Sequence, residues 1–482
     1  MVNYICDKCE KSFHKKSNDA GHKKCNTACK KGLSKVKSYG GSEESDGNES
    51  KNESKNESKN ESKNESKNES KNESKNEKKY SELSYNLTKC LDKVEKKNNG
   101  IYFTPPSTIE KNIERLKKYK NLNEITSVLE PACGSLEYVT ALMKEKSDMK
   151  IKAVELNKVI YDSIKKYKSE RLNIENSDYL KSDEIEKYDL IIGNPPFYVM
   201  KKEEIDVKYY DYFDGRPNIF ILFIIKSLEL LNENGILSFV LPRSFLNCLY
   251  YDKTRRYISK NYNIIDIIEC DDEYIDTKQE TIIMLVEKSK GENENNKYVL
   301  NKGNNTIFGS EENINKLNEL YKSSSTLKEM GFKVNVGNIV WNQCKSELTS
   351  DDSKTLLIYS SDIKNNKLCV QSYKNEEKKN YINREGAIGP LLVINRGYGV
   401  GNYKFEYCLL EGKKEYLVEN HLICIKKIDG DVGISNESVE GEYKKMIESF
   451  RDKRTEEFIK LYFGNNAINT TELCELLPIY DI

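Results

Sequence analysis

Residues 188–197 read YDLIIGNPPF, an apolar run that ends in Asn194, Pro195, Pro196 and Phe197. The run predicts a buried strand, and the two prolines restrict their own backbone and that of the preceding residue, so a rigid loop should follow. Open α/β sheets bind ligands at the carboxyl ends of their strands. There Asn194 can offer its side-chain carbonyl, and Pro195 its backbone carbonyl, to an amino group, while Phe197 can stack on a planar base. The alternative is an ordinary turn that carries two prolines by chance.

Further apolar runs alternate with stretches of helical period on both sides of this segment. They are ITSVLE (125–130), IKAVEL (151–156), GILSFVL (235–241), IIDIIEC (264–270) and TIIMLVE (281–287). Such alternation predicts parallel strands joined by crossover helices. The expected fold class is therefore α/β, with a doubly wound, Rossmann-like domain.

Small or acidic residues follow the strands on the N-terminal side of NPPF. VLEPACGS (128–135) places small residues in a loop, where the backbone can approach a nucleoside-like cofactor. Glu155 ends the next strand about 20 residues later, a position suited to gripping ribose hydroxyls. Asp178, in NSDYL (176–180), can accept a hydrogen bond from an adenine amino group. Surface acids are usually only solvated, but together with NPPF these residues favour a cofactor site.

The 482-residue chain divides into segments of different composition. Residues 1–31 are rich in Cys, His and Lys, and residues 32–79 include six consecutive KNES copies from Lys51 to Ser74. On a helix this period would place like charges at i,i+4, and the copies contain no apolar residue to bury, so a disordered linker is expected. Residues 80–295 carry the α/β pattern, and residues 296–482 predict a separate α+β domain.

Several of these stretches together resemble the amino-methyltransferases that act on DNA, in the motif order called gamma. GIYFTPP (100–106) resembles motif X, LEPACGS (129–135) motif I, VELN (154–157) motif II, SDYL (177–180) motif III and IIGNPPF (191–197) motif IV. The sequence is most similar to the TaqI-like and Eco57I-like adenine-specific enzymes. Fragments such as LLVINRGYG (391–399) resemble the target recognition domain of that branch.

The resemblance implies a site-specific enzyme that moves a methyl group from S-adenosyl-L-methionine to N6 of an adenine flipped out of double-stranded DNA. It implies catalytic roles for Asn194, Pro195, Pro196 and Phe197, with Tyr274 stacking on the other face of the base. It also implies a cofactor site made of Tyr102, Thr104, Pro105, Glu130, Pro131, Ala132, Gly134, Glu155, Leu156, Asp178 and Tyr179.

Two positions depart from the family pattern. Leu136 stands where motif I usually has glycine, and Tyr274 stands where the family commonly has phenylalanine. Tyrosine can stack as well as phenylalanine, so the role survives; the alternative is a core tyrosine, one of 32 in the chain.

The first residues contain the pattern Cys6-x2-Cys9-x12-His22-x6-Cys29. The first two intervals are those of a C2H2-type finger, and a segment with so little apolar content needs a metal or a disulfide to fold. The pattern resembles the Cys-Cys-His-Cys fingers of large DNA viruses, which implies Zn²⁺ bound by these four residues. Cys25 is an alternative fourth ligand.

Charged residues stand where a signal peptide would be apolar, and no apolar run approaches the length of a membrane span. The sequence therefore predicts an intracellular protein without a membrane partner, in the cytoplasm or, if viral, in a viral factory or the nucleus. A zero net charge excludes a global basic field. A cognate restriction endonuclease, if there is one, should be a separate chain. The alternatives are an RNA or protein (glutamine) methyltransferase, or a DNA-binding relative with weakened catalysis.

Overall fold

The structure is a computed structural model. It describes the backbone of residues 3–6, 12–13 and 33–36, and residues 80–146, 148–289, 297–396, 405–428, 436–463 and 468–481. The chain divides into two compact units, Met1–Glu73 and Ser74–Ile482. Among the described residues, none of the helices combines the length and the apolar composition that crossing a membrane requires.

The N-terminal unit contains a three-stranded antiparallel sheet in the order β2-β1-β3. β1 (Asn3–Cys6) pairs with β2 (Ser12–Phe13) and, along its whole length, with β3 (Leu33–Val36). The sequence predicted that this unit ends at residue 31, but β3 belongs to its sheet, so the unit extends at least to Val36. The KNES copies lie outside the described residues.

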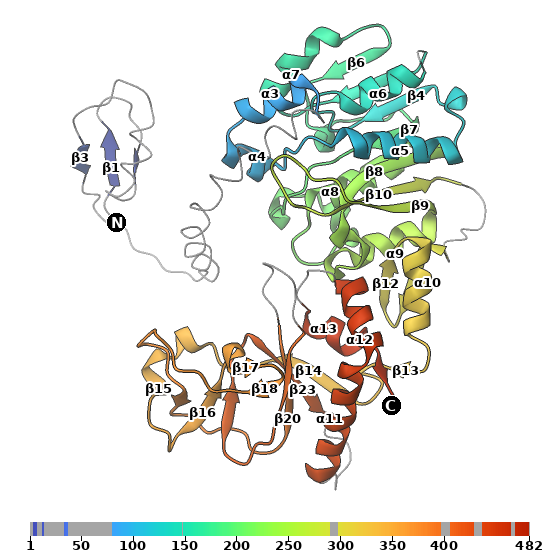
Figure 1. The fold of residues 1–482 in the computed structure, drawn as a ribbon. Helices are drawn as coiled ribbons and strands as arrows, with labels where there is room; N and C mark the ends of the chain where they lie inside the picture. Colours follow the sequence, from blue (N-terminus) through green and yellow to red (C-terminus); the bar gives the residue numbers. More distant parts are fainter. Residues whose placement is uncertain are drawn as a thin grey trace. The chain divides into compact units, whose positions relative to one another are not determined.

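The second unit contains a seven-stranded sheet in the order β6-β5-β4-β7-β8-β10-β9 (Figure 1). Its strands are β4 (Ser127–Glu130), β5 (Lys150–Val154), β6 (Leu172–Glu175), β7 (Tyr188–Gly193), β8 (Leu231–Pro242), β9 (Asn263–Cys270) and β10 (Thr281–Glu287). The strands from β4 to β8 pair in parallel, which confirms the doubly wound, Rossmann-like fold. β10, predicted to be parallel, instead pairs antiparallel with β8 and β9, because residues 271–280 are too short for a crossover.

Helices cover both faces of this sheet (Figure 1). α5 (Pro106–Tyr119), α6 (Glu137–Glu145) and α7 (Lys158–Ile164) pack in one core, and α8 (Ile219–Glu229) and α9 (Asp252–Asn261) pack in the other. Successive strand residues point to opposite faces, so Leu190 and Ile192 of β7 enter the first core and Ile191 enters the second. Among the described residues, α5 is preceded by α3 (Glu82–Cys90) and α4 (Lys93–Asn99).

The C-terminal part is α+β, as the sequence predicted. One antiparallel sheet contains β14 (Phe332–Val336), β23 (Leu422–Lys427), β20 (Leu391–Asn395) and β21 (Tyr407–Leu410), in that order. A second sheet contains β15 (Leu348–Thr349), β19 (Tyr381–Ile382), β16 (Thr355–Ile358) and β22 (Tyr416–Val418), in that order. The first sheet shares a core with α10 (Glu311–Leu320), α11 (Asn436–Arg451), α12 (Lys453–Phe458) and α13 (Thr470–Glu475).

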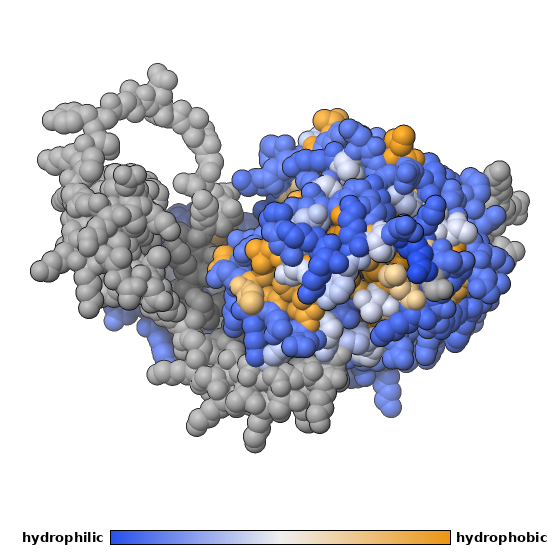
Figure 2. Space-filling model, turned by 90° about the horizontal axis from the view of Figure 1, so that it is seen from above, coloured by the Kyte–Doolittle hydropathy of each residue, from blue (hydrophilic) through white to orange (hydrophobic). Residues whose placement is uncertain are grey.

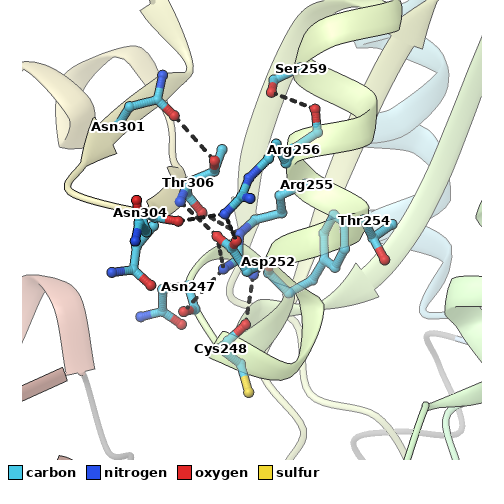
Figure 3. A network of polar contacts seen from close by, with 12 residues as sticks. Asn247, Cys248, Asp252, Thr254, Arg255, Arg256, Ser259, Asn301, Asn304 and Thr306 are labelled. Carbon is cyan, nitrogen blue, oxygen red and sulfur yellow. Dashed lines mark hydrogen bonds and ion pairs between the residues drawn. The ribbon is translucent and has the colours of Figure 1, made fainter. Parts of the chain in front are cut away.

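A hairpin of β11 (Val299–Lys302) and β12 (Asn305–Phe308) follows the α/β part and is fixed to its helix α9. The side chain of Arg255 on α9 is fully buried and donates hydrogen bonds to the carbonyls of Cys248 (2.8 Å) and Thr306 (2.5 Å), within the network shown in Figure 3. A buried guanidinium is stable only if its donors are paired. The sequence assigned this hairpin to the C-terminal domain; in the structure Phe308 packs in the core of α8 and α9, and Ile307 packs in the core that contains α10 to α13.

Candidate active site and cofactor pocket

The predicted site residues gather at the carboxyl ends of β4 and β7, which are neighbours in the sheet. From β4 the chain continues to β5 and β6 on one side of the sheet, and from β7 it continues to β8 on the other. This reversal opens a crevice between the loops that follow β4 and β7, where α/β sheets bind their ligands. NPPF begins directly after Gly193, the last residue of β7.

Asn194 is held by the segment that the sequence compares with motif X. Its Nδ2 donates hydrogen bonds to the Thr104 hydroxyl (3.0 Å) and to the Tyr102 carbonyl (3.4 Å). These bonds define the orientation of the amide, so its other atom, Oδ1, faces away from the segment. That oxygen is buried and has no hydrogen-bond partner among the described residues. Leaving a buried acceptor unpaired costs about 1–3 kcal/mol, so a ligand N–H is the expected partner.

The same segment touches both loops of the crevice. Gly100 ends α4 in the left-handed conformation (φ +62°), and a Cβ built on it would lie 2.7 Å from the Phe197 backbone nitrogen. The ring of Phe103 lies 3.5 Å from the position of a Cβ on Gly134. Pro105 precedes α5, whose first residue is Pro106, a position where the missing N–H is not needed. The segment therefore bridges the loop after β4 and the loop after β7.

Glu155 lies at the end of β5 and is only 7% exposed. Its carboxylate accepts hydrogen bonds from the backbone N–H groups of Gly134 (2.9 Å) and Asn157 (2.7 Å). Burial raises the pKa of Glu155 to about 7, against the opposing effect of these backbone donors. A carboxylate oxygen has more than one lone pair, so each can still accept a ligand hydroxyl.

Glu130, the last residue of β4, is also buried, and burial raises its pKa well above the usual range. Its Oε2 has no hydrogen-bond partner among the described residues. Neither Glu130 nor Glu155 forms an ion pair with a residue that the structure describes. Two buried acids without a counter-charge among the described residues favour a cationic ligand.

Other predicted cofactor residues lie in the loops that follow β4 and β6. Asp178 is half-buried and accepts a hydrogen bond from the Leu180 N–H (3.0 Å). Tyr179 differs, because its side chain is buried and its hydroxyl is hydrogen-bonded to Ser227 Oγ (2.9 Å), so it supports the loop from within the core. Ala132 and Gly134 are partly exposed, whereas Pro131 is buried.

Leu136 adopts the left-handed backbone conformation, which is why motif I usually has glycine at this position. Its φ is +65°, in the left-handed region, immediately before α6. An L-residue there costs about 1–2 kcal/mol relative to the right-handed conformation. The side chain is 4% exposed and packs in the core beside α5 and α6, so it does not fill the cofactor loop.

The two predicted base-stacking residues are in different surroundings. Phe197 is half-buried, and its ring packs edge-on against Phe220 (centroids 5.9 Å apart). Tyr274, in the 271–280 connection, is only 6% exposed, and its hydroxyl is buried. Burial raises the pKa of Tyr274 well above its ordinary value. Phe197 is therefore partly exposed, whereas Tyr274 is enclosed.

Exposed apolar side chains lie near these loops. Leu156 follows Glu155 and is 62% exposed, and Val199 follows NPPF and is 59% exposed. Figure 2 shows one face of the molecule, largely hydrophilic, on which hydrophobic side chains form a few patches. An apolar residue beside a polar pocket is suited to contact the flat face of a base.

Two cavities, of about 1500 Å³ and 1130 Å³, lie away from NPPF and Glu155. The first is lined by the C-terminal sheets and α11. The second lies between the 271–280 connection and C-terminal residues that include Tyr407 and Phe450. It borders the loop that carries Tyr274 on the side of the C-terminal part.

No group of three or more His, Cys, Asp or Glu side chains within the described part of the chain is arranged to hold a metal ion. Of the predicted zinc ligands, Cys6 ends β1, while Cys9, His22 and Cys29 lie outside the described residues.

The sequence-based prediction missed two residues of the site. Gly100 was quoted only as part of a motif, although a glycine after a lysine- and asparagine-rich helix is a recognised helix-end signal. Lys96, on α4, forms an ion pair with Asp276 (2.6 Å). No local sequence pattern indicates this pair, because the two residues are 180 positions apart.

The chain is similar to known proteins over its α/β part and beyond. Residues 132–275, which include NPPF, match the family model described as Eco57I restriction-modification methylase. Among solved structures, the type IIG restriction endonuclease BpuSI covers 80% of this chain and 59% of its own, with 9% identity and a TM-score of 0.39.

Two viral proteins resemble the chain over most of its length. Modification methylase CviBIII of Paramecium bursaria Chlorella virus NC1A is 27% identical over 416 residues, 83% of this chain and 99% of that protein. Type II methyltransferase M.CvrRI of Paramecium bursaria Chlorella virus XZ-6E is 24% identical over 411 residues, with the same two shares. The chain is thus similar over most of its length to two type II modification methylases, and its residues 132–275 match the Eco57I restriction-modification methylase model.

Proposed function

We propose that this chain is a site-specific DNA methyltransferase that transfers a methyl group from S-adenosyl-L-methionine to N6 of adenine. The observation that carries the proposal is the buried Oδ1 of Asn194 at the carboxyl end of β7, which has no hydrogen-bond partner among the residues that the structure describes. An adenine amino group supplies the N–H that this oxygen lacks. The neighbouring Pro195 carbonyl is suited to accept the second N–H.

The pocket suits S-adenosyl-L-methionine because this cofactor carries a sulfonium and an ammonium group. Glu130 and Glu155 are buried acids without a cationic partner among the described residues. Glu155 would hold the ribose hydroxyls, Glu130 would contribute to the binding of the positive charge, and Asp178 would receive the cofactor's adenine amino group. When bound, the cofactor supplies an electrophilic methyl group.

Asn194 and Pro195 would then act by orienting the target amino group. Two acceptors on the target amino group direct its lone pair toward the methyl carbon; the N–C bond forms as the C–S bond breaks, and the nitrogen then loses a proton to solvent. Catalysis of this kind is mainly positioning, so no covalent nucleophile is needed. The base must first leave the duplex, at a cost of a few kcal/mol. Phe197 would stack on it, and Tyr274, once its ring is uncovered, would pack against the other face of the base.

The direct test is to incubate the purified chain with labelled S-adenosyl-L-methionine and duplex DNA, and to sequence DNA from a host that expresses it. We expect N6-methyladenine at one short sequence. Label in cytosine, or in RNA or protein in place of DNA, would contradict the proposal. A separate restriction endonuclease is the expected companion, and its target should be the same sequence.

Glu155 provides a prediction on pH. Because its pKa is about 7 in the folded protein, the carboxyl is mostly protonated at pH 6 and mostly charged at pH 8. Ribose hydroxyls donate better to the charged form, so the affinity for S-adenosyl-L-methionine measured by calorimetry should fall about tenfold from pH 8 to pH 6. Glu155→Gln should bind more weakly by about 1.5–3 kcal/mol and lose this pH dependence. Equal affinities at the two pH values would exclude Glu155 as a ligand.

We further propose that residues 1–31 bind one Zn²⁺ through Cys6, Cys9, His22 and Cys29 and add affinity for DNA. The first 30 residues carry seven lysines and three acids, so they are suited to contact phosphates. Phosphate contacts add salt-dependent affinity but little sequence information. The KNES copies end at Ser74. Tyr80 follows them, and its hydroxyl donates a hydrogen bond to the Glu273 carbonyl, beside Tyr274.

Deletion of residues 1–79 should therefore weaken DNA binding at moderate salt and flatten its salt dependence, while the methylated sequence stays the same. Binding titrations over a salt series and sequencing of the methylated DNA would measure both effects. A changed target sequence would mean that the finger reads bases. For the metal itself, Cys29→Ser should lose zinc and Cys25→Ser should keep it; the reverse would identify Cys25 as the ligand.

A further inference from the structure

The short helix α4 contacts all three loops of the proposed site. Glu95 accepts a hydrogen bond from Asn157 Nδ2 (2.9 Å), in the loop that carries the ribose-binding acid. The next residue, Lys96, forms an ion pair with Asp276 (2.6 Å), in the connection that carries Tyr274. Gly100, at the end of α4, lies against the backbone of Phe197. The helix α4, drawn in blue beside α3 in Figure 1, thus contacts three loops. They are the loop after β5, the 271–280 connection and the NPPF loop.

Lys96 is unusually enclosed for a lysine on a short surface helix. Its side chain is 5% exposed, and its Nζ donates to the Thr88 carbonyl on α3 (2.8 Å) as well as to Asp276 Oδ2 (2.6 Å). Asp276 is 27% exposed. A buried ammonium without acceptors is strongly disfavoured, so Lys96 holds Asp276 firmly in place.

The 271–280 connection is attached to the N-terminal helices at further points. Asp272 accepts hydrogen bonds from Ser107 (2.6 Å) and Thr108 (2.7 Å) of α5, and the Glu273 carbonyl accepts one from Tyr80 (3.4 Å). Tyr274 lies between these attachments and the Lys96–Asp276 pair. The position of Tyr274 is therefore set largely by helices that precede the sheet in sequence.

We propose that Lys96 is a positioning residue that, through Asp276, sets the place of the Tyr274 loop relative to the cofactor loop and NPPF. The inference rests on the proposed function. Because Glu95 and Lys96 are adjacent on α4, this helix joins the loop that carries Glu155 to the connection that carries Tyr274. Loss of the pair leaves the cofactor pocket intact but releases the C-terminal side of the base-stacking loop.

The test compares Lys96→Met, Asp276→Asn and the double variant with wild type. Lys146→Met is the matched control, because Lys146 also caps backbone carbonyls (Asn123 and Ile125, both at 3.0 Å) and pairs with an aspartate, but far from the base loop in sequence. The DNA carries 2-aminopurine in place of the adenine that wild type methylates, so that base flipping is read as fluorescence. Cofactor affinity comes from calorimetry, and the transfer rate on normal DNA from single turnovers.

We expect Lys96→Met and Asp276→Asn to bind the cofactor within threefold of wild type, to lose most of the 2-aminopurine signal, and to transfer methyl groups about a hundredfold more slowly. The double variant should be no slower than either single variant, because both remove one interaction. Hydrogen exchange in residues 271–280 should accelerate in both variants and stay unchanged in Lys146→Met.

Wild-type flipping and rates in both single variants, or an equal loss in Lys146→Met, would overturn the positioning role. If wild type itself methylates no DNA, the proposed function fails, and hydrogen exchange still decides the structural claim. In that case unchanged exchange in residues 271–280 of Lys96→Met would show that Lys96 does not hold the loop.

Discussion

Replacement of Asn194 by alanine should lower the single-turnover rate of methyl transfer about 100- to 1,000-fold, or about 2.7–4 kcal/mol, the usual loss for one preorganised polar contact at a reacting group. The reason lies in the two ends of its amide. Thr104 and Tyr102 hold Nδ2, so that the unpartnered Oδ1 is aimed before the substrate arrives. Alanine removes the aimed oxygen without disturbing Glu155, so cofactor affinity should stay within a few-fold.

Asn173→Ala is the matched control, because Asn173 is an asparagine of β6 whose Nδ2 donates a hydrogen bond to Glu175 Oε1 (2.8 Å). It should retain wild-type transfer. Activity of Asn194→Ala within threefold of wild type would refute the assignment of NPPF as the catalytic loop. Equal losses in transfer and in cofactor affinity would mean that Asn194 supports the fold of the pocket instead.

Replacement of Gly100 by alanine should have the second largest effect, a fall of about a hundredfold in the transfer rate, because a displacement of about 1 Å at the reacting groups costs that much. The new Cβ would lie 2.7 Å from the Phe197 nitrogen and 3.1 Å from Pro196 Cβ, so the NPPF loop must move. The left-handed backbone adds strain of about 1 kcal/mol to the folded state.

Gly303→Ala separates the clash from the strain. Gly303 has a similar φ (+56°), but a Cβ there would meet nothing within 4 Å. In a urea titration, the free energy of unfolding of Gly303→Ala should fall by about the amount that backbone strain alone costs Gly100→Ala. The transfer rate of Gly303→Ala should equal that of wild type. If the two variants transferred methyl groups equally fast, the contact between α4 and NPPF would have no role in catalysis.

Features of the fold that depend on local sequence were predictable, whereas features that depend on contacts between distant segments were not. The strong apolar runs predicted β4, β5, β7, β8, β9 and β10 correctly as strands, since burial on both faces leaves a continuous apolar pattern. β6 (LNIE) carried no such pattern, because it lies at the edge of the sheet and alternates buried with partly exposed residues. The direction of β10 depends on the length of the 271–280 connection, and an apolar pattern carries no information about that length.

The cofactor loops were predictable for a related reason. The acids and glycines that follow parallel strands all meet at one edge of the sheet, so Glu130, Glu155 and Asn194 converge without further information. Their electrostatic state was not predictable. The pKa of Glu155 is raised to about 7 because surrounding elements bury it, and no local pattern reports that burial.

By itself, then, the sequence determined the elements whose causes are local: the strands, the proline-fixed NPPF loop, and the acids at strand ends. Only the tertiary structure decided which distant side chains meet. Lys96 and Asp276 are 180 residues apart, Tyr274 is enclosed instead of exposed, and Leu136 occupies a left-handed position with its side chain in the core. Each of these results from packing between segments distant in sequence, where the free energy of burial outweighs local preference.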